Sequence, residues 1–253
     1  MQFSVGRRFR DGFALLKVGV LLAPLFFGRD ACATEIAVDV GHTLTASGAV
    51  SARGGKEFDF NRGFAERLVQ ALETKDLSVR RINFDGRIES LDARPRQAVG
   101  SDLFISIHHD SVQAKFLEQW VWAGKAETFS DRHRGFSLFV SHNNPDLRTS
   151  LLCASTIGAR LRRLGFVGAS HHVDSIEGQA RPFADADNFV YYYDNLVVLY
   201  RTTLPAVLFE AGVIKHREEE LALRDPGLQA RMADGIATGV AACLYVKTNI
   251  EYR

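Results

Sequence analysis

The sequence lacks an excess of charge of either sign and lacks a long apolar run. Its 31 basic and 30 acidic side chains leave a net charge of +1. This balance argues against a nucleic-acid-binding protein, which usually carries a basic excess. The apolar run at residues 18–27 is too short to cross a bilayer. The sequence therefore predicts no nucleic-acid partner and no membrane span in the mature protein.

The N-terminus has the layout of an export signal. Basic residues precede the apolar run, and Ala31-Cys32-Ala33 follows it as an A-x-A cleavage site. This order is typical of a secretory signal peptide. We therefore expect residues 1–33 to be removed before Thr34 and the mature chain to work in the periplasm or cell envelope. The alternative is a buried N-terminal helix.

Cysteine is scarce as well. Beyond the predicted signal peptide only Cys153 and Cys243 remain, each within an apolar pattern of helical spacing. An oxidising compartment would permit a disulfide between them. Buried thiols, however, also behave as small hydrophobic side chains. We expect two separate thiols.

No linker rich in Pro, Gly or Ser divides residues 34–253, so we expect a single domain. Apolar, β-branched runs alternate with amphipathic segments along it, and this alternation is typical of a mostly parallel sheet. The expected fold is α/β, an open, twisted, mostly parallel sheet with helices on both faces. Strands are expected at 35–40, 77–84, 103–109, 119–124, 135–142 and 205–214, with extended structure at 190–202 and edge positions for 119–124 and 135–142. Helices are expected at 57–75, 89–100, 147–164 and 226–245.

Three of the predicted strands finish in residues suited to metal binding or proton transfer. The first runs into His42, the strand at 103–109 contains His108, and the strand at 205–214 contains Glu210. Glu57 opens the first long helix. Because sites in open α/β sheets lie beyond the carboxyl ends of the strands, these four side chains are expected to converge.

Two imidazoles and one carboxylate form a known ligand set for catalytic zinc. A further carboxylate is then needed as general base, and burial at the end of its strand suits Glu210 to that task. Taken singly, each residue has a structural alternative: a hydrogen-bonded histidine, a helix-start glutamate, or a buried acid paired with arginine. The spacing alone is not specific, and no H-E-x-x-H motif occurs.

Four ordered motifs nevertheless resemble one family. The segments "IAVDVGHT", "GAVSARGGKEFDFN", "ARPRQAVGSDLFISIHHDS" and "PAVLFEAGVIKH" are similar to those of the zinc-dependent N-acetylmuramoyl-L-alanine amidases, the type-3 amidases of bacterial cell walls. The resemblance implies one Zn²⁺ per chain held by His42, Glu57 and His108, with Glu210 as the catalytic base. It also implies hydrolysis of the amide between N-acetylmuramic acid and L-alanine of the stem peptide. The family commonly has Ala-Asn where His109-Asp110 stand here.

Other residues are candidates for lining the pocket or supporting the ligands: Arg94, His109, Asp110, His171 and His172. His109 should point away from His108, since neighbouring strand residues face opposite sides. The histidines at 171 and 172 lie in a long polar connection, 170–195, of the kind that often forms lids or binding loops. They are also the reserve metal ligands if the first choice is wrong.

Peptidoglycan is the expected partner, with an activator protein beside it. The first strand starts almost at the predicted mature N-terminus, so targeting is expected to depend on that partner or on the loops. Two rival functions remain: another zinc peptidase or deacetylase of the cell wall, and a metal-free wall-binding module.

Overall fold

The computed structural model describes residues 34–173 and 181–251, which belong to one compact unit. The predicted signal peptide, residues 1–33, lies outside the described residues. Among the helices that are described, none is long and apolar enough to cross a membrane.

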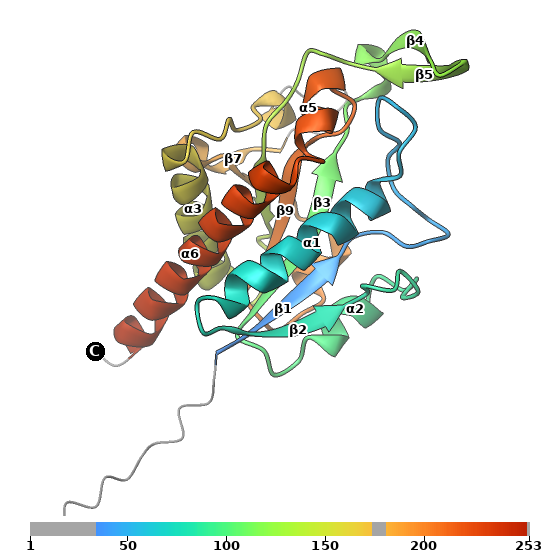
Figure 1. The fold of residues 1–253 in the computed structure, drawn as a ribbon. Coiled ribbons are helices and arrows are strands. Elements are labelled where there is room, and N and C mark those ends of the chain that lie inside the picture. Colours follow the sequence, from blue (N-terminus) through green and yellow to red (C-terminus); the bar gives the residue numbers. More distant parts are fainter. Residues whose placement is uncertain (1–33, 174–180, 252–253) are drawn as a thin grey trace, which may run out of the picture. The chain divides into compact units, whose positions relative to one another are not determined.

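A seven-stranded sheet forms the centre of the fold (Figure 1). Four neighbouring strands pair in parallel, and three of them carry the continuous apolar runs. A fifth strand pairs antiparallel with the last of these four and continues the sheet on the other side. The order across the sheet is β2 (Ser78–Ile82), β1 (Glu35–Val40), β3 (Leu103–Asp110), β9 (Ala206–Val213), β6 (Ser137–Val140), β8 (Val190–Tyr192) and β7 (Phe183–Asp185). The expected α/β fold with a mostly parallel sheet is confirmed.

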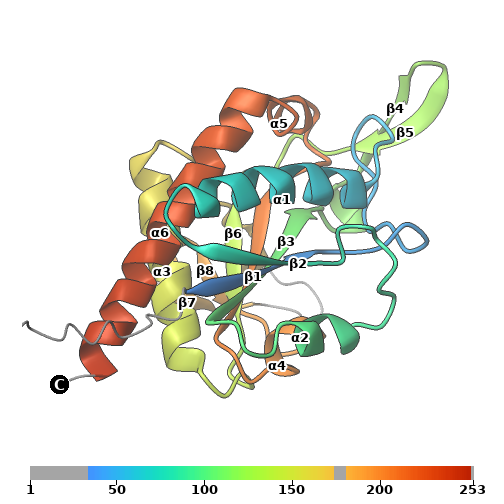
Figure 2. The same cartoon turned by 60° about the horizontal axis from the view of Figure 1, so that its bottom comes forward.

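Helices cover both faces of this sheet (Figure 2). One face packs against the long helices α1 (Glu57–Glu73), α3 (Leu147–Arg163) and α6 (Pro226–Glu251). The other packs against the short helices α2 (Ala93–Gln97) and α4 (Val197–Tyr200), while α5 (Arg217–Ala222) follows β9.

The side chains of β3 alternate between these two cores. Leu103, Ile105 and Ile107 lie in the larger core beneath the long helices, and Phe104 lies in the smaller one. Because side chains two apart share a face of a strand, His108 and Asp110 belong to the face of the short helices. His109 belongs to the face of α1.

Some expected elements are placed differently. The strand expected at 135–142 forms β6, which lies inside the sheet between β9 and β8 rather than at an edge. The strand expected at 119–124 forms β4 (Glu118–Trp122), which pairs only with β5 (Lys125–Phe129) in a separate two-stranded sheet. Of the extended structure expected at 190–202, only β8 (Val190–Tyr192) forms a strand, and the short helix α4 (Val197–Tyr200) follows it.

The expectation of two separate thiols is wrong. Cys153 of α3 and Cys243 of α6 form a disulfide, with their Cα atoms 5.0 Å apart. The two helices pack closely side by side on one face of the sheet (Figure 1). Helical periodicity shows that both cysteines face the core, but it does not show that their helices are neighbours.

Candidate metal centre and active site

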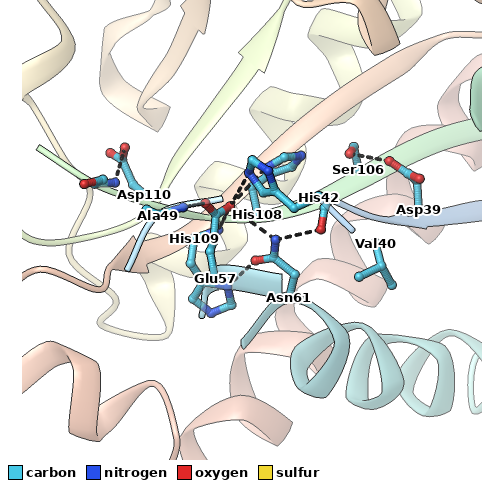
Figure 3. Close-up of polar contacts among 12 residues, drawn as sticks. Asp39, Val40, His42, Ala49, Glu57, Asn61, Ser106, His108, His109 and Asp110 are labelled. Carbon is cyan, nitrogen blue, oxygen red and sulfur yellow. Dashed lines mark hydrogen bonds and ion pairs between the residues drawn. The ribbon is translucent and has the colours of Figure 1, made fainter. Parts of the chain in front are cut away.

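One carboxylate oxygen lies at the centre of the candidate metal site (Figure 3). Oε1 of Glu57 is 3.0 Å from Nε2 of His42 and 3.1 Å from Nδ1 of His108. His42 follows the end of β1, His108 comes from β3, and Glu57 is the first residue of α1. The sheet edge thus brings together the three residues that the sequence suggested as metal ligands, with one donor atom from each within 4.8 Å of the others.

The backbone around His42 is shaped to leave room for these side chains. His42 itself has a φ of 68°, a left-handed conformation that is uncommon for a residue with a side chain. A Cβ atom at Gly41 would lie 2.3 Å from the ring of His108. A Cβ at Gly48, where φ is +77°, would lie 2.3 Å from Oε2 of Glu57. Glycine, which has no Cβ, is therefore favoured at both positions.

Side chains from neighbouring elements hold the turn that presents His42. Asn83, after β2, donates from Nδ2 to the carbonyl oxygens of Val40 at 2.7 Å and His42 at 2.6 Å. Arg94 of α2 donates from Nη1 to the Val40 carbonyl at 3.2 Å and to Asp39 at 3.3 Å. Arg94 is buried and fixes the end of β1.

Hydrogen bonds also fix the orientation of the Glu57 carboxylate (Figure 3). Its Oε2 accepts from the backbone N–H of Ala49 at 2.9 Å, and its Oε1 accepts from Nδ2 of Asn61 at 3.2 Å. Burial tends to raise the pKa of Glu57, but the contacts with His108 and His42 outweigh it and hold this pKa below its usual range. The carboxylate is therefore charged at neutral pH.

His109 lies on the opposite face of β3 from His108, as the alternation predicts. Its Nδ1 is 2.8 Å from Oδ1 of Asn61, and its ring packs beside Phe60 and Phe64 of α1. Burial lowers the pKa of His109 to about 3, so the ring is neutral. Because Asn61 also contacts Glu57, His109 supports a candidate ligand indirectly.

Glu210 of β9 lies beside His108 in the register of the sheet. Burial raises the pKa of Glu210 well above its usual value, and the nearby carboxylates of Asp110 and Glu57 raise it further. Within the described chain its buried Oε2 has no hydrogen-bond partner. Such a carboxyl group holds a proton more readily than a solvated one, a property that suits a group which takes up a proton and passes it on.

The remaining candidates, His171 and His172, do not join the first three ligands. They lie in a short 3₁₀ turn, His171–Val173, and gather around Asp110 as a second group of ligand-type residues. Burial tends to raise the pKa of Asp110, but the two imidazoles outweigh it and hold this pKa below its usual range.

An apolar pocket of about 250 Å³ opens beside the first ligand group. His42 and His108 form part of its wall, and aliphatic side chains from the β9 and α4 region form another: Leu196, Val197, Val198 and Leu208. It gives an uncharged substrate group a place next to the candidate ligands.

Sequence reasoning missed the residues that orient the candidate ligands. The Asn61 amide donates to the Gly41 carbonyl and to Glu57. The Asn83 amide donates to the carbonyls of Val40 and His42. A buried asparagine on the apolar side of a predicted helix, as Asn61 is, was an available signal. Asn83 at the end of a strand carried none.

The donor set of the first group fits zinc. Two imidazole nitrogens and one carboxylate oxygen converge, all three are at least partly buried, and the carboxylate is charged. Neutral histidine and ionised carboxylate are the forms in which these side chains bind Zn²⁺.

Comparisons with known proteins agree on one family. The family described as N-acetylmuramoyl-L-alanine amidase matches residues 36–242. Among solved structures, the Ami1 amidase of Mycobacterium smegmatis is 18% identical with a TM-score of 0.67, covering 84% of this chain and 97% of that one. The CwlV catalytic domain of Bacillus (Paenibacillus) polymyxa var. colistinus is 23% identical with a TM-score of 0.60, covering 84% and 99%.

A third similar structure, an N-acetylmuramoyl-L-alanine amidase of Clostridium difficile 630, is 22% identical with a TM-score of 0.62, covering 84% of this chain and 97% of that one. A search of curated protein sequences found no match. At these identities the structural likeness concerns the fold, whereas the family match spans most of the sequence and all four of the central site residues. The protein thus belongs to the N-acetylmuramoyl-L-alanine amidase family, and it is a hydrolase of the amide that joins N-acetylmuramic acid to L-alanine in peptidoglycan.

Proposed function

We propose that His42, Glu57 and His108 hold a single catalytic zinc ion and that Glu210 is the general base of the amidase reaction. This division of roles between ligands and base rests on the shared oxygen of Glu57, which lies 3.0 Å from the His42 nitrogen and 3.1 Å from the His108 nitrogen. Glu210 lies beside His108 in the sheet, and no ion pair within the described residues joins it to His42 or His108.

A zinc ion bound there supplies a Lewis acid for the amide carbonyl and lowers the pKa of water to about 7. Glu210 accepts the proton that the attacking water loses and delivers it to the nitrogen of the leaving L-alanine as the C–N bond breaks. The raised pKa of Glu210 favours this return of the proton. Asn61 and the N–H of Ala49 keep Glu57 oriented throughout.

The apolar pocket indicates how the substrate lies. Aliphatic side chains predominate in its lining, which favours uncharged groups next to His42 and His108, although Glu89 and Arg94 also line it. We place the uncharged lactyl and alanine groups around the scissile amide there. The charged parts of the stem peptide then extend toward solvent.

Residues 1–33 act as a signal peptide in this proposal, and residues 34–253 form the catalytic domain, which works in the periplasm or cell envelope. A protein partner regulates it. The support is a solved neighbour, the CwlD amidase of Clostridioides difficile, 19% identical with a TM-score of 0.59, whose structure is a complex with the GerS lipoprotein.

Digestion of purified peptidoglycan tests the proposed activity. The mature chain, residues 34–253, should release whole stem peptides with a free N-terminal L-alanine. A chelator should abolish the release and added zinc should restore it. Products cut within the stem peptide would assign the zinc site to a peptidase, loss of acetate alone would assign it to a deacetylase, and binding without any product would indicate a wall-binding module.

A further inference from the structure

Asp110, His171 and His172 repeat the arrangement of the first ligand group. Oδ2 of Asp110 is 3.1 Å from Nε2 of His171 and 3.1 Å from Nε2 of His172. As with Glu57, one carboxylate oxygen faces two imidazole nitrogens, and one donor atom from each residue lies within 4.8 Å of the others.

The second group is separate from the first but lies on the same face of the sheet. Asp110 is two residues beyond His108 on β3, roughly 7 Å along the strand. His172 comes from the other side, where its Nε2 lies 3.1 Å from the hydroxyl of Ser137 on β6. Ser137 is the register partner of Glu210. Glu210 thus has one ligand group on each side.

The contacts of Asp110 are short but are not hydrogen bonds. Its Oδ2 and both ring nitrogens of His171 are buried and have no hydrogen-bond partner in the described residues. The side chains of the two histidines are 9% and 3% exposed, and that of Asp110 is 14% exposed. Leaving a buried carboxylate oxygen without a donor is costly, and a cation between these atoms would remove that cost.

We propose that Asp110, His171 and His172 form a second zinc site, beyond the single catalytic ion. Its ligand types are those of catalytic zinc sites, two imidazoles and a carboxylate, which leave one position open. That position faces a polar pocket of about 240 Å³, lined also by Ser111, Gln113 and Arg181. The inference does not depend on the amidase activity, since it concerns metal content alone.

Arg181 sets the affinity of this second site. Its Nη1 lies 3.2 Å from Nδ1 of His172, and since arginine can only donate, that nitrogen accepts. The proton of the neutral ring is then on Nε2, where it is donated to the hydroxyl of Ser137 and not to Asp110. Zinc binding at Nε2 has to move this proton and break the contact with Arg181. The second site therefore binds zinc more weakly than the first.

Equilibrium dialysis of the metal-stripped mature chain against rising free zinc, with bound metal measured by elemental analysis, tests this inference. The wild-type protein should reach two zinc ions per chain. Asp110→Asn and His171→Gln should each reach one and retain the tighter site. His42→Ala should also reach one, but retain the weaker site.

Two further variants make the test specific. His142→Gln is the matched control, because His142 pairs with a single carboxylate, Asp194, at 3.1 Å on the surface; it should still bind two. Arg181→Gln should tighten the second site by about tenfold, the effect of removing one charged hydrogen bond. Circular dichroism checks that each variant is folded.

A plateau at one zinc ion in the folded wild-type protein would overturn the proposal. So would two ions in both Asp110→Asn and His171→Gln, because the second ion would then be held elsewhere. Weaker zinc binding in Arg181→Gln would contradict the competition between Arg181 and the metal. Activity on peptidoglycan is not measured here, so failure of this proposal leaves the proposed amidase site intact.

Discussion

At the scale of single residues, the convergence of the candidate ligands could be predicted, whereas the residues that support them could not. His42, His108 and Glu210 were found because each follows or ends a buried apolar run, and parallel strands end at one edge. Glu57 was found from its place at a helix start. Asn61 and Asn83 act through amide contacts with backbone carbonyls that lie 20 and more residues away in sequence. Such contacts exist only after folding; the one signal in the sequence is the place of Asn61 on the apolar side of its helix, and Asn83 has no such signal.

Substitution separates the metal ligand from the general base. Glu210→Gln keeps the size of the side chain but removes the proton acceptor, so zinc content should persist while turnover falls roughly 10²–10⁴-fold. His108→Ala should instead lose zinc, since it removes one of three protein ligands. Metal analysis and release of stem peptides from peptidoglycan should be measured on both variants.

Loss of zinc in Glu210→Gln would show that Glu210 is a ligand. Wild-type turnover in the same variant would place the base elsewhere, and His109, His171 and His172 would be tested next.

Gly41 offers a second test at this scale. A methyl group there would meet the His108 ring at 2.3 Å, so Gly41→Ala should displace the ring and lower zinc affinity without removing any ligand. Gly63→Ala on α1 is the matched control, because nothing lies within 4 Å of a Cβ at that position. Isothermal titration with zinc compares the two. Equal affinity in both variants would show that His108 can move aside without loss of binding.

At the scale of elements, burial decided how well the sequence could be interpreted. The strands β1, β3 and β9 are buried along most of their length and match the expected ranges closely. The β4–β5 pair is largely exposed, so its sequence carries little alternation and β5 was missed. The place of β6 between β9 and β8 follows from long-range pairing, which apolar content alone does not encode.

The disulfide belongs to this scale because it joins two helices through cysteines that are 90 residues apart in sequence. A loop of this length predicts a stabilisation of about 4–5 kcal/mol from the lost entropy of the unfolded chain. The double variant Cys153→Ala, Cys243→Ala should therefore unfold at markedly lower denaturant concentration than the oxidised protein, with little change in zinc content. Reductant should lower the wild-type midpoint and leave that of the double variant unchanged.

Thiol titration of the unfolded, unreduced mature protein gives the independent check. It should find no free thiol, and two free thiols would mean that the bridge does not form in solution.

At the scale of the whole molecule, one partly buried carboxylate connects three distant segments. Glu219 of α5 accepts hydrogen bonds from the backbone N–H groups of Gly135 and Val213, at 2.9 Å each. Gly135 precedes β6 and Val213 ends β9. Burial raises the pKa of Glu219 from 4.5 to about 7, although these N–H groups oppose the shift. The protonation of one side chain is thereby linked to the stability of the entire fold.

The sign of this linkage gives the last prediction. Between pH 4.5 and pH 7 the native state binds the Glu219 proton more tightly than the unfolded state, so the free energy of unfolding falls as the pH rises through this window. Between pH 5 and pH 8 the loss from this group should be about 2–3 kcal/mol, at about 1.4 kcal/mol for each unit of pKa difference. Glu219→Gln cannot ionise and should lack this part of the decline, whereas Glu218→Gln, on the exposed side of α5, should keep it. Urea unfolding at several pH values, with chelator present so that metal binding adds no pH dependence, measures the difference. Parallel pH profiles for the wild type and Glu219→Gln would mean that Glu219 is already ionised across this range, and the link between α5, β6 and β9 would then be a carboxylate held by its N–H donors.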